Sequence, residues 1–172
     1  MNETTGLEAI LLEIDFVRRY YAAANATLLD VGGYHPALSP AEQTALLAEV
    51  GLPSRYDSNE RFHRHVDEPA SAWLHVSFQP GFSDDGGTVP GAIEVGIYRP
   101  ADVHRDGPAS GGPWHLLAYD LALRADPTWQ PPERSYPTLR YGTTRDPAAT
   151  LAIVTGIYRD IRERLVQTRP KP

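Results

Sequence analysis

The sequence contains no cysteine and only one lysine, Lys171. Without cysteine the chain cannot form a disulfide framework, use a thiolate nucleophile, or bind zinc or an iron–sulfur cluster through sulfur. It also has no apolar run long enough to cross a bilayer. The residues after Met1 resemble neither a basic leader nor an apolar secretion signal. We therefore expect a cytoplasmic protein that does not associate with membranes.

Positive charge is also in short supply, because 16 basic residues face 22 acidic ones and the net charge is −6. Nucleic-acid binding depends on Lys and Arg side chains that neutralise phosphates, so we predict no nucleic-acid partner. Anionic membrane surfaces are disfavoured for the same reason. An acidic surface suits docking on a basic protein, and we expect a protein partner. The sequence does not indicate an oligomeric state.

The length of 172 residues fits one domain, and a chain of this size buries enough surface to fold without a metal or disulfide. The pattern of apolar residues predicts an α+β fold. We expect a single domain with a three- to five-stranded, mainly antiparallel sheet. Helices are expected in the N-terminal region 1–53, the sheet in 72–142, and a C-terminal amphipathic helix packed on it in 146–168.

Helix signals mark both ends of the chain. Apolar residues at helical spacing predict one long helix over residues 7–26. Ser39 begins a capping box for a second helix, which Gly51 ends. Asp146 is the expected N-cap of the C-terminal helix, the clearest element of the sequence. Gly156 lies inside that helix, and we interpret it as a position where the helix backbone packs closely on the sheet.

Strand signals occupy the middle of the chain. Residues 72–79 and 92–98 alternate apolar and polar side chains with the period of a half-buried strand. The alternation assigns six residues to the core face: Leu74, Val76, Phe78, Ile93, Val95 and Ile97. The apolar stretch 114–124 is predicted as a third, central strand. Residues 62–66 are either a loop or an edge strand, and 138–141 form a short further strand.

The opposite face of this sheet is the main candidate binding surface. We expect it to carry Trp73 and His75 from one strand, Glu94 and Tyr98 from the next, and His115 from the third. Aromatic rings with a carboxylate and imidazoles form a good recognition surface. A buried Glu–His pair there would also be capable of acid–base chemistry. Alternatively, a helix covers this face and the aromatic residues belong to the core.

A second candidate surface is the proline-rich segment 126–137, which contains Trp129 and Tyr136. Loops of about 12 residues are uncommon in compact domains and are often functional. Proline stiffens the segment, so presenting either aromatic ring to a partner costs little conformational entropy. The alternative interpretation is a rigid crossover with Trp129 packed inward.

Two histidines offer a candidate metal site. His63 and His65 point to the same side if residues 62–66 form a strand, and Asp67 continues that side. The His-x-His pair with a nearby carboxylate resembles the first half of the cupin metal motif. The carboxylate is not at the cupin offset and no second half follows, so His104 would supply the third histidine. This resemblance implies a divalent metal; otherwise we expect no cofactor.

No nucleotide-binding, dinucleotide-binding, hydrolase or zincin signature is present in the sequence. The leading hypothesis is therefore a non-catalytic protein-binding domain, comparable with a bacterial inhibitor or immunity protein that neutralises its partner. The alternative is a small metal-dependent, cupin-like enzyme or a small-molecule-binding domain that uses His63 and His65. A pocket lined by Trp73, His75, Glu94 and Tyr98 is a further option.

Overall fold

The computed structural model describes residues 6–29, 32–33, 35–81, 91–100, 110–130 and 137–168. Within these ranges the chain forms five helices and six strands. In chain order they are α1 (Gly6–Glu13), α2 (Phe16–Leu29), α3 (Pro40–Glu49), β1 (Arg55–Asp57), β2 (Phe62–Asp67), β3 (Ala72–Gln79), β4 (Gly91–Arg99), β5 (Ser110–Pro113), α4 (Trp114–Ala125), β6 (Leu139–Tyr141) and α5 (Pro147–Gln167). The predicted α+β single-domain fold is confirmed, with one strand more than expected.

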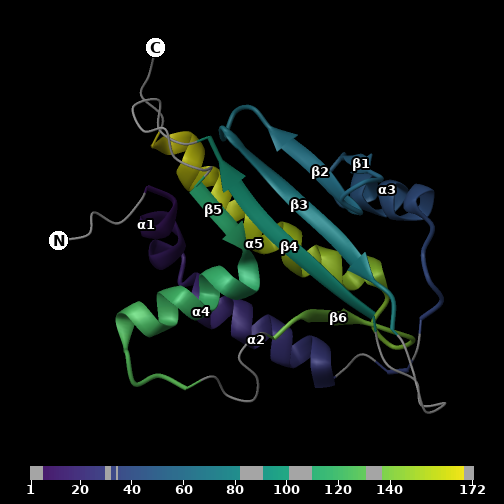
Figure 1. Ribbon diagram of the computed structural model, residues 1–172, viewed down its shortest axis with the longest axis horizontal. Helices are drawn as coiled ribbons and strands as arrows, with labels where there is room; N and C mark the ends of the chain where they lie inside the picture. The colour runs from purple at the N-terminus through teal and green to yellow at the C-terminus, as the bar shows by residue number, and fades with distance from the viewer. Residues whose placement is uncertain are drawn as a thin grey trace.

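The six strands form one antiparallel sheet in the order β1-β2-β3-β4-β5, and β6 also pairs with β4. The far edge of β4 is therefore shared by two short strands. Gly91–Ile93 pair with β6, and Gly96–Arg99 pair with β5. Figure 1 shows α5 crossing behind the sheet, with α2 and α4 at its lower border.

The core lies between the sheet and α5. The predicted core face is confirmed, because all six of its residues are buried: Leu74, Val76, Phe78, Ile93, Val95 and Ile97. Antiparallel register places Leu74 opposite Ile97 and Val76 opposite Val95. The buried stripe of α5 packs into the same core and includes Leu151, Val154, Ile161 and Leu165. Apolar burial of this kind is the main stabilising contribution to the fold.

The N-terminal helix is divided, so the prediction of one helix over residues 7–26 is wrong. α1 ends at Glu13 and α2 begins at Phe16. Asp15 between them has φ 56°, in the left-handed region that interrupts a right-handed helix. The break lets both helices bury their apolar sides, and Leu11 and Phe16 are completely buried.

The expected third strand at 114–124 is also wrong, because Trp114–Ala125 form α4. The buried residues of this segment recur at helical spacing: Trp114, Ala118, Leu121 and Ala122. The strand that pairs with β4 in this region is instead the short segment Ser110–Pro113. The ambiguous segment 62–66 lies in β2 and is paired on one side with β1 and on the other with β3.

Both predicted helix caps are confirmed. The Ser39 hydroxyl accepts a hydrogen bond from the Glu42 amide, and the Ser39 amide donates to the Glu42 carboxylate at 2.7 Å. The Asp146 carboxylate accepts from the Ala149 amide at 2.8 Å. Gly51, after α3, has φ +83°, which favours glycine. In the part of the chain that is described, no helix combines the length and apolar character needed to span a membrane.

The interpretation of Gly156 is wrong. A Cβ atom built on this residue meets no heavy atom within 4 Å, so the helix backbone does not pack closely there. The glycine faces open space beside α5. A helix-interior glycine costs about 1 kcal/mol relative to alanine, and here no packing contact explains it.

Candidate functional site

The sheet has an open face, opposite the core face. Among the described helices none lies over β2, β3 and β4 on the side turned to the viewer in Figure 1. Its residues alternate with the core residues along each strand, and Trp73, His75, Glu94 and Tyr98 are all half-buried there. The alternative that a described helix covers these residues is therefore wrong.

Four rings form a continuous row across the open face. Trp73 and Tyr98 are cross-strand partners whose ring centroids lie 6.1 Å apart with nearly parallel planes. The Tyr98 ring is 4.5 Å from the His75 ring, which stacks on Phe62 at 3.9 Å. Such contacts hold the rings in fixed orientations. We call Phe62, Trp73, His75 and Tyr98 the aromatic row.

Gly96 gives the row its close packing. It lies opposite His75, and the Tyr98 ring folds over it. A Cβ atom at this position would stand 2.7 Å from Cε2 of Tyr98, too close for any real contact. Glycine is therefore required if Tyr98 is to lie against His75, the arrangement known as aromatic rescue of a strand glycine.

Burial and the neighbouring Arg64 together favour the uncharged form of His75. Nε of Arg64 donates a hydrogen bond to Nε2 of His75 at 3.3 Å, and the Arg64 guanidinium lies 5.8 Å from the Phe62 ring. Burial, and then the positive charge of Arg64, lower the pKa of His75 to about 4, although Asp57 opposes the shift. His75 is therefore uncharged at neutral pH, and this pKa is far from that of an efficient acid–base catalyst at pH 7.

A hollow of about 430 Å3 lies beside the aromatic row. Two carboxylates, Glu60 and Glu94, and one guanidinium, Arg61, line it. His115 also lines it, although it comes from the first turn of α4 rather than from a third strand. Four of the sequence-predicted residues thus line the hollow: His75, Glu94, Tyr98 and His115.

Trp129 lies elsewhere. Its ring meets Tyr21 of α2 at 5.2 Å and Tyr119 of α4 at 6.0 Å, both edge-on. It is half-buried, which favours the inward interpretation of this segment. The remaining candidate, Tyr136, falls outside the described residues. The structure therefore does not join the 126–137 segment to the aromatic row.

The candidate metal ligands already have hydrogen-bond partners. His63 is completely buried, and its Nε2 lies 2.9 Å from the Gln43 side-chain oxygen. Nδ1 of His65 lies 2.7 Å from the Pro53 carbonyl oxygen. His104 is outside the described residues, and within them no three His, Cys, Asp or Glu side chains are grouped to hold a metal ion. Each of these hydrogen bonds occupies one ring nitrogen, and Nδ1 of His63 is buried without a hydrogen-bond partner in the described part of the chain.

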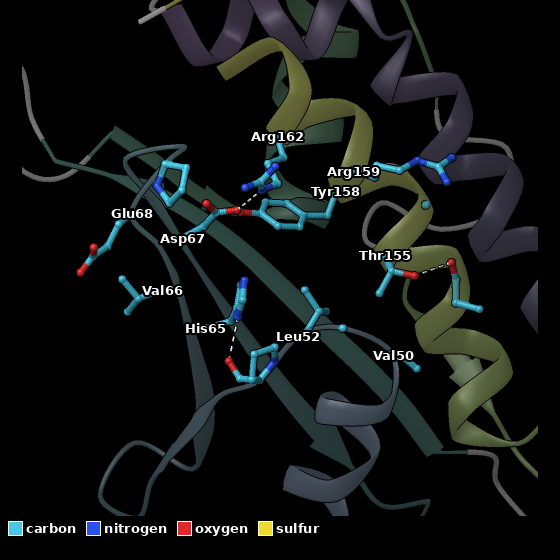
Figure 2. A pocket seen from close by; sticks show the side chains of 15 residues that line it. Val50, Leu52, His65, Val66, Asp67, Glu68, Thr155, Tyr158, Arg159 and Arg162 are labelled. Carbon is cyan, nitrogen blue, oxygen red and sulfur yellow. Dashed lines mark hydrogen bonds and ion pairs between the residues drawn. The ribbon is translucent and has the colours of Figure 1, made fainter. Parts of the chain in front are cut away.

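Asp67 belongs to a different arrangement, shown in Figure 2. Its carboxylate accepts hydrogen bonds from the Tyr158 hydroxyl at 2.8 Å, Arg162 Nε at 2.6 Å and the Ala70 amide at 3.2 Å. Burial alone would raise the pKa of Asp67, but these hydrogen bonds outweigh it and hold the pKa below its usual value. Burial and the bond to Asp67 raise the pKa of Tyr158. Sequence reasoning missed this cluster.

The cluster closes one end of a groove between β2 and α5, with a volume of about 680 Å3. The segment Val50–Pro53 lines one side of it, where Figure 2 shows Val50 and Leu52, and Gly156 lines it from α5. The open space beside Gly156 is this groove. Its walls are mainly apolar; Asp67, Tyr158 and Arg162 gather at one end, whereas Thr155 and Arg159 lie apart from them on α5 (Figure 2).

Comparison with protein-family models, with curated proteins and with solved structures finds no match for this chain.

Proposed function

We propose that this chain is a non-catalytic binding domain that recognises a partner protein through the open face of its sheet. The aromatic row carries this proposal. Trp, Tyr and Arg side chains dominate binding energies in protein interfaces, and Trp73, Tyr98 and Arg64 stand together on this face. Because the rings already stack on one another, fixing them in a complex costs little entropy.

Charge indicates the kind of partner. The protein carries a net charge of −6, and two carboxylates against one guanidinium line the hollow beside the row. His75 is uncharged, and Arg64 beside it adds a second positive charge to this face, which the protein's net charge outweighs. A Lys or Arg side chain of a basic partner fits such a place, because cations are attracted to aromatic faces and to carboxylates.

An acidic domain that covers a basic surface inhibits its partner when that surface includes the partner's active site. Bacterial inhibitor and immunity proteins work in this way, and we propose this form of the function, exercised in the cytoplasm. The metal-dependent alternative is less favoured, because Asp67 is hydrogen-bonded to Arg162 and no three candidate ligands are grouped within the described residues.

The test compares two tryptophan substitutions in affinity capture from the source cells. Trp73→Ala removes a ring of the aromatic row, whereas Trp129→Ala removes a ring that packs on α2 and α4. We expect a stoichiometric partner that Trp129→Ala retains. Trp73→Ala should weaken its binding about 30-fold, the effect of losing a hot-spot side chain worth about 2 kcal/mol.

Circular dichroism and thermal melting establish that both variants are folded. The captured protein should also bind less tightly at higher salt, because charge contributes to its recognition. The proposal is wrong if no stoichiometric partner is captured, or if Trp73→Ala and Tyr98→Ala bind that partner as tightly as the wild type does.

A further inference from the structure

We propose that the groove between β2 and α5 is a binding site for a small neutral molecule that joins an apolar body to an amide group. The groove lies on the side of β2 that carries His65 and Asp67, away from the open face. Its volume of about 680 Å3 falls within the range of roughly 300–1,000 Å3 that is typical of ligand pockets. The inference does not depend on the proposed protein partner.

The apolar part of the groove has two sides. Val50 and Leu52 lie on one side, facing α5 in Figure 2, and Pro53 lines the groove with them. On the α5 side the lining includes Ala152 and Gly156. These two small residues are one helical turn apart, so this part of α5 leaves space that larger side chains would fill. Nothing stands within 4 Å of a Cβ at Gly156. This is space for the apolar body of a ligand.

The polar end has balanced charges. Asp67 is only 6% exposed, and its negative charge is matched by Arg162, whose Nε lies 2.6 Å from Oδ2. The other two charged residues of the lining, Glu68 and Arg159, are solvent-exposed and of opposite sign, so the lining as a whole is also balanced. A charged ligand head placed between Asp67 and Arg162 would meet no unmatched counter-charge in this partly dehydrated end, which is unfavourable. A neutral head avoids that cost.

The hydrogen-bonding groups at this end select an amide. Nδ1 of His65 lies 2.7 Å from the Pro53 carbonyl, which only accepts, so Nδ1 carries the proton. In the uncharged ring Nε2 is then an acceptor. Arg162 uses Nε on Asp67 and is partly exposed, so its terminal nitrogens are available as donors. An amide supplies both complements, its N–H to His65 and its carbonyl to Arg162.

Figure 2 shows that the two partners face the same space. The His65 ring lies on one side, and Tyr158 and Arg162 on the other. The ring of His65 is 6.1 Å from the ring of Tyr158, which closes the end of the groove between them. A ligand whose head binds here places its apolar body against the apolar walls beside Gly156.

Three probes with one apolar body test the chemistry: 4-phenylbutanamide, 4-phenylbutanoate and 4-phenylbutylamine. Each is titrated into isotope-labelled protein at pH 7.5, and binding is followed by the backbone amide signals in NMR spectra. We expect the neutral amide to bind in the millimolar range usual for fragments, at least about 10-fold more tightly than either charged probe. The shifted signals should belong to the β2 and α5 walls.

Two variants of α5 test the location. Gly156→Leu fills the groove and should weaken amide binding about 10-fold or more, whereas Ala149→Leu adds the same side chain at an exposed position outside it. Arg162→Met should remove the preference for the amide. The spectrum of each unliganded variant shows whether it is folded.

The proposal is overturned if a charged probe binds as tightly as the amide, or if none of the three shifts signals from the groove walls. It is also overturned if folded Gly156→Leu binds the amide like the wild type. Loss of partner capture by Trp73→Ala has no bearing on these results, so the two proposals fail separately.

Discussion

Gly156 and Gly51 form a natural pair for a test of stability. Both have open space where a Cβ would be, because neither has a heavy atom within 4 Å of that position. They differ in backbone conformation: Gly156 lies in the interior of α5, whereas Gly51 has φ +83°. Alanine at each position therefore isolates the backbone contribution from any steric clash.

At Gly156, alanine gains the difference in helix propensity, which is about 0.8–1 kcal/mol, and pays no packing penalty. At Gly51, alanine must adopt a left-handed conformation, which costs about 1–2 kcal/mol. The two variants should thus differ by about 2–3 kcal/mol in the free energy of unfolding. For a chain of this length, each kcal/mol corresponds to a shift of roughly 2–4 °C in Tm.

Urea unfolding monitored by circular dichroism measures both changes, with melting temperature as a second readout. We expect the urea midpoint to rise for Gly156→Ala and to fall for Gly51→Ala, with unchanged slopes. A destabilised Gly156→Ala would refute the reasoning, because it would mean that the α5 backbone is packed at this position. An unchanged Gly51→Ala would contradict the left-handed conformation.

Two further predictions concern titratable groups. Burial lowers the pKa of His63 and of His75, the latter to about 4. As the pH falls, these histidines therefore bind protons in the unfolded chain before they do so in the folded chain. The stability that the two histidines contribute is complete above about pH 6.5 and is lost as the pH falls towards 4. Urea midpoints measured across this range should decline, and less steeply in His75→Gln. Asp67→Ala removes the acceptor of three hydrogen bonds and should lower the free energy of unfolding by about 2–3 kcal/mol. Tyr158→Phe removes one donor and should lower it by about 1 kcal/mol. Equal losses for the two variants in urea unfolding would argue against that network.

The parts of the fold that sequence predicted correctly have strong periodicity. Leu74, Val76 and Phe78 alternate with polar neighbours, and a strand buried on one face must show this period. The Asp146 cap begins the helix that carries Leu151 and Val154. Local pattern and tertiary burial agree in these segments, so the pattern is sufficient.

The errors arise where local signals are weak or mixed. Leu116 interrupts the alternation expected of a strand over 114–124. The spacing of Trp114, Ala118 and Leu121 is helical and is the signal that decides the element. β5 is Ser-Gly-Gly-Pro, which has no strand-like side chains and pairs through its backbone alone. No local sequence pattern therefore predicts β5.

The candidate sites were predictable to different extents. The alternation places three members of the aromatic row on one face, Trp73, His75 and Tyr98, and cross-strand pairing brings Trp73 to Tyr98. Phe62 is not among them, because its strand is ambiguous in the sequence. The cluster of Asp67 with Tyr158 and Arg162 joins residues more than 90 positions apart, and only the folded chain shows that they meet.

That long separation also sets an order for synthesis. The strands from β1 to β4 are made before α5, so the buried side of the sheet lacks this helix while the later part of the chain is still on the ribosome. The Asp67 carboxylate likewise lacks its hydrogen-bond donors Tyr158 and Arg162 until α5 is made, and until then it is exposed to water. The nascent chain completes its core only after α5 emerges, so folding depends on contacts between segments that are far apart in the sequence.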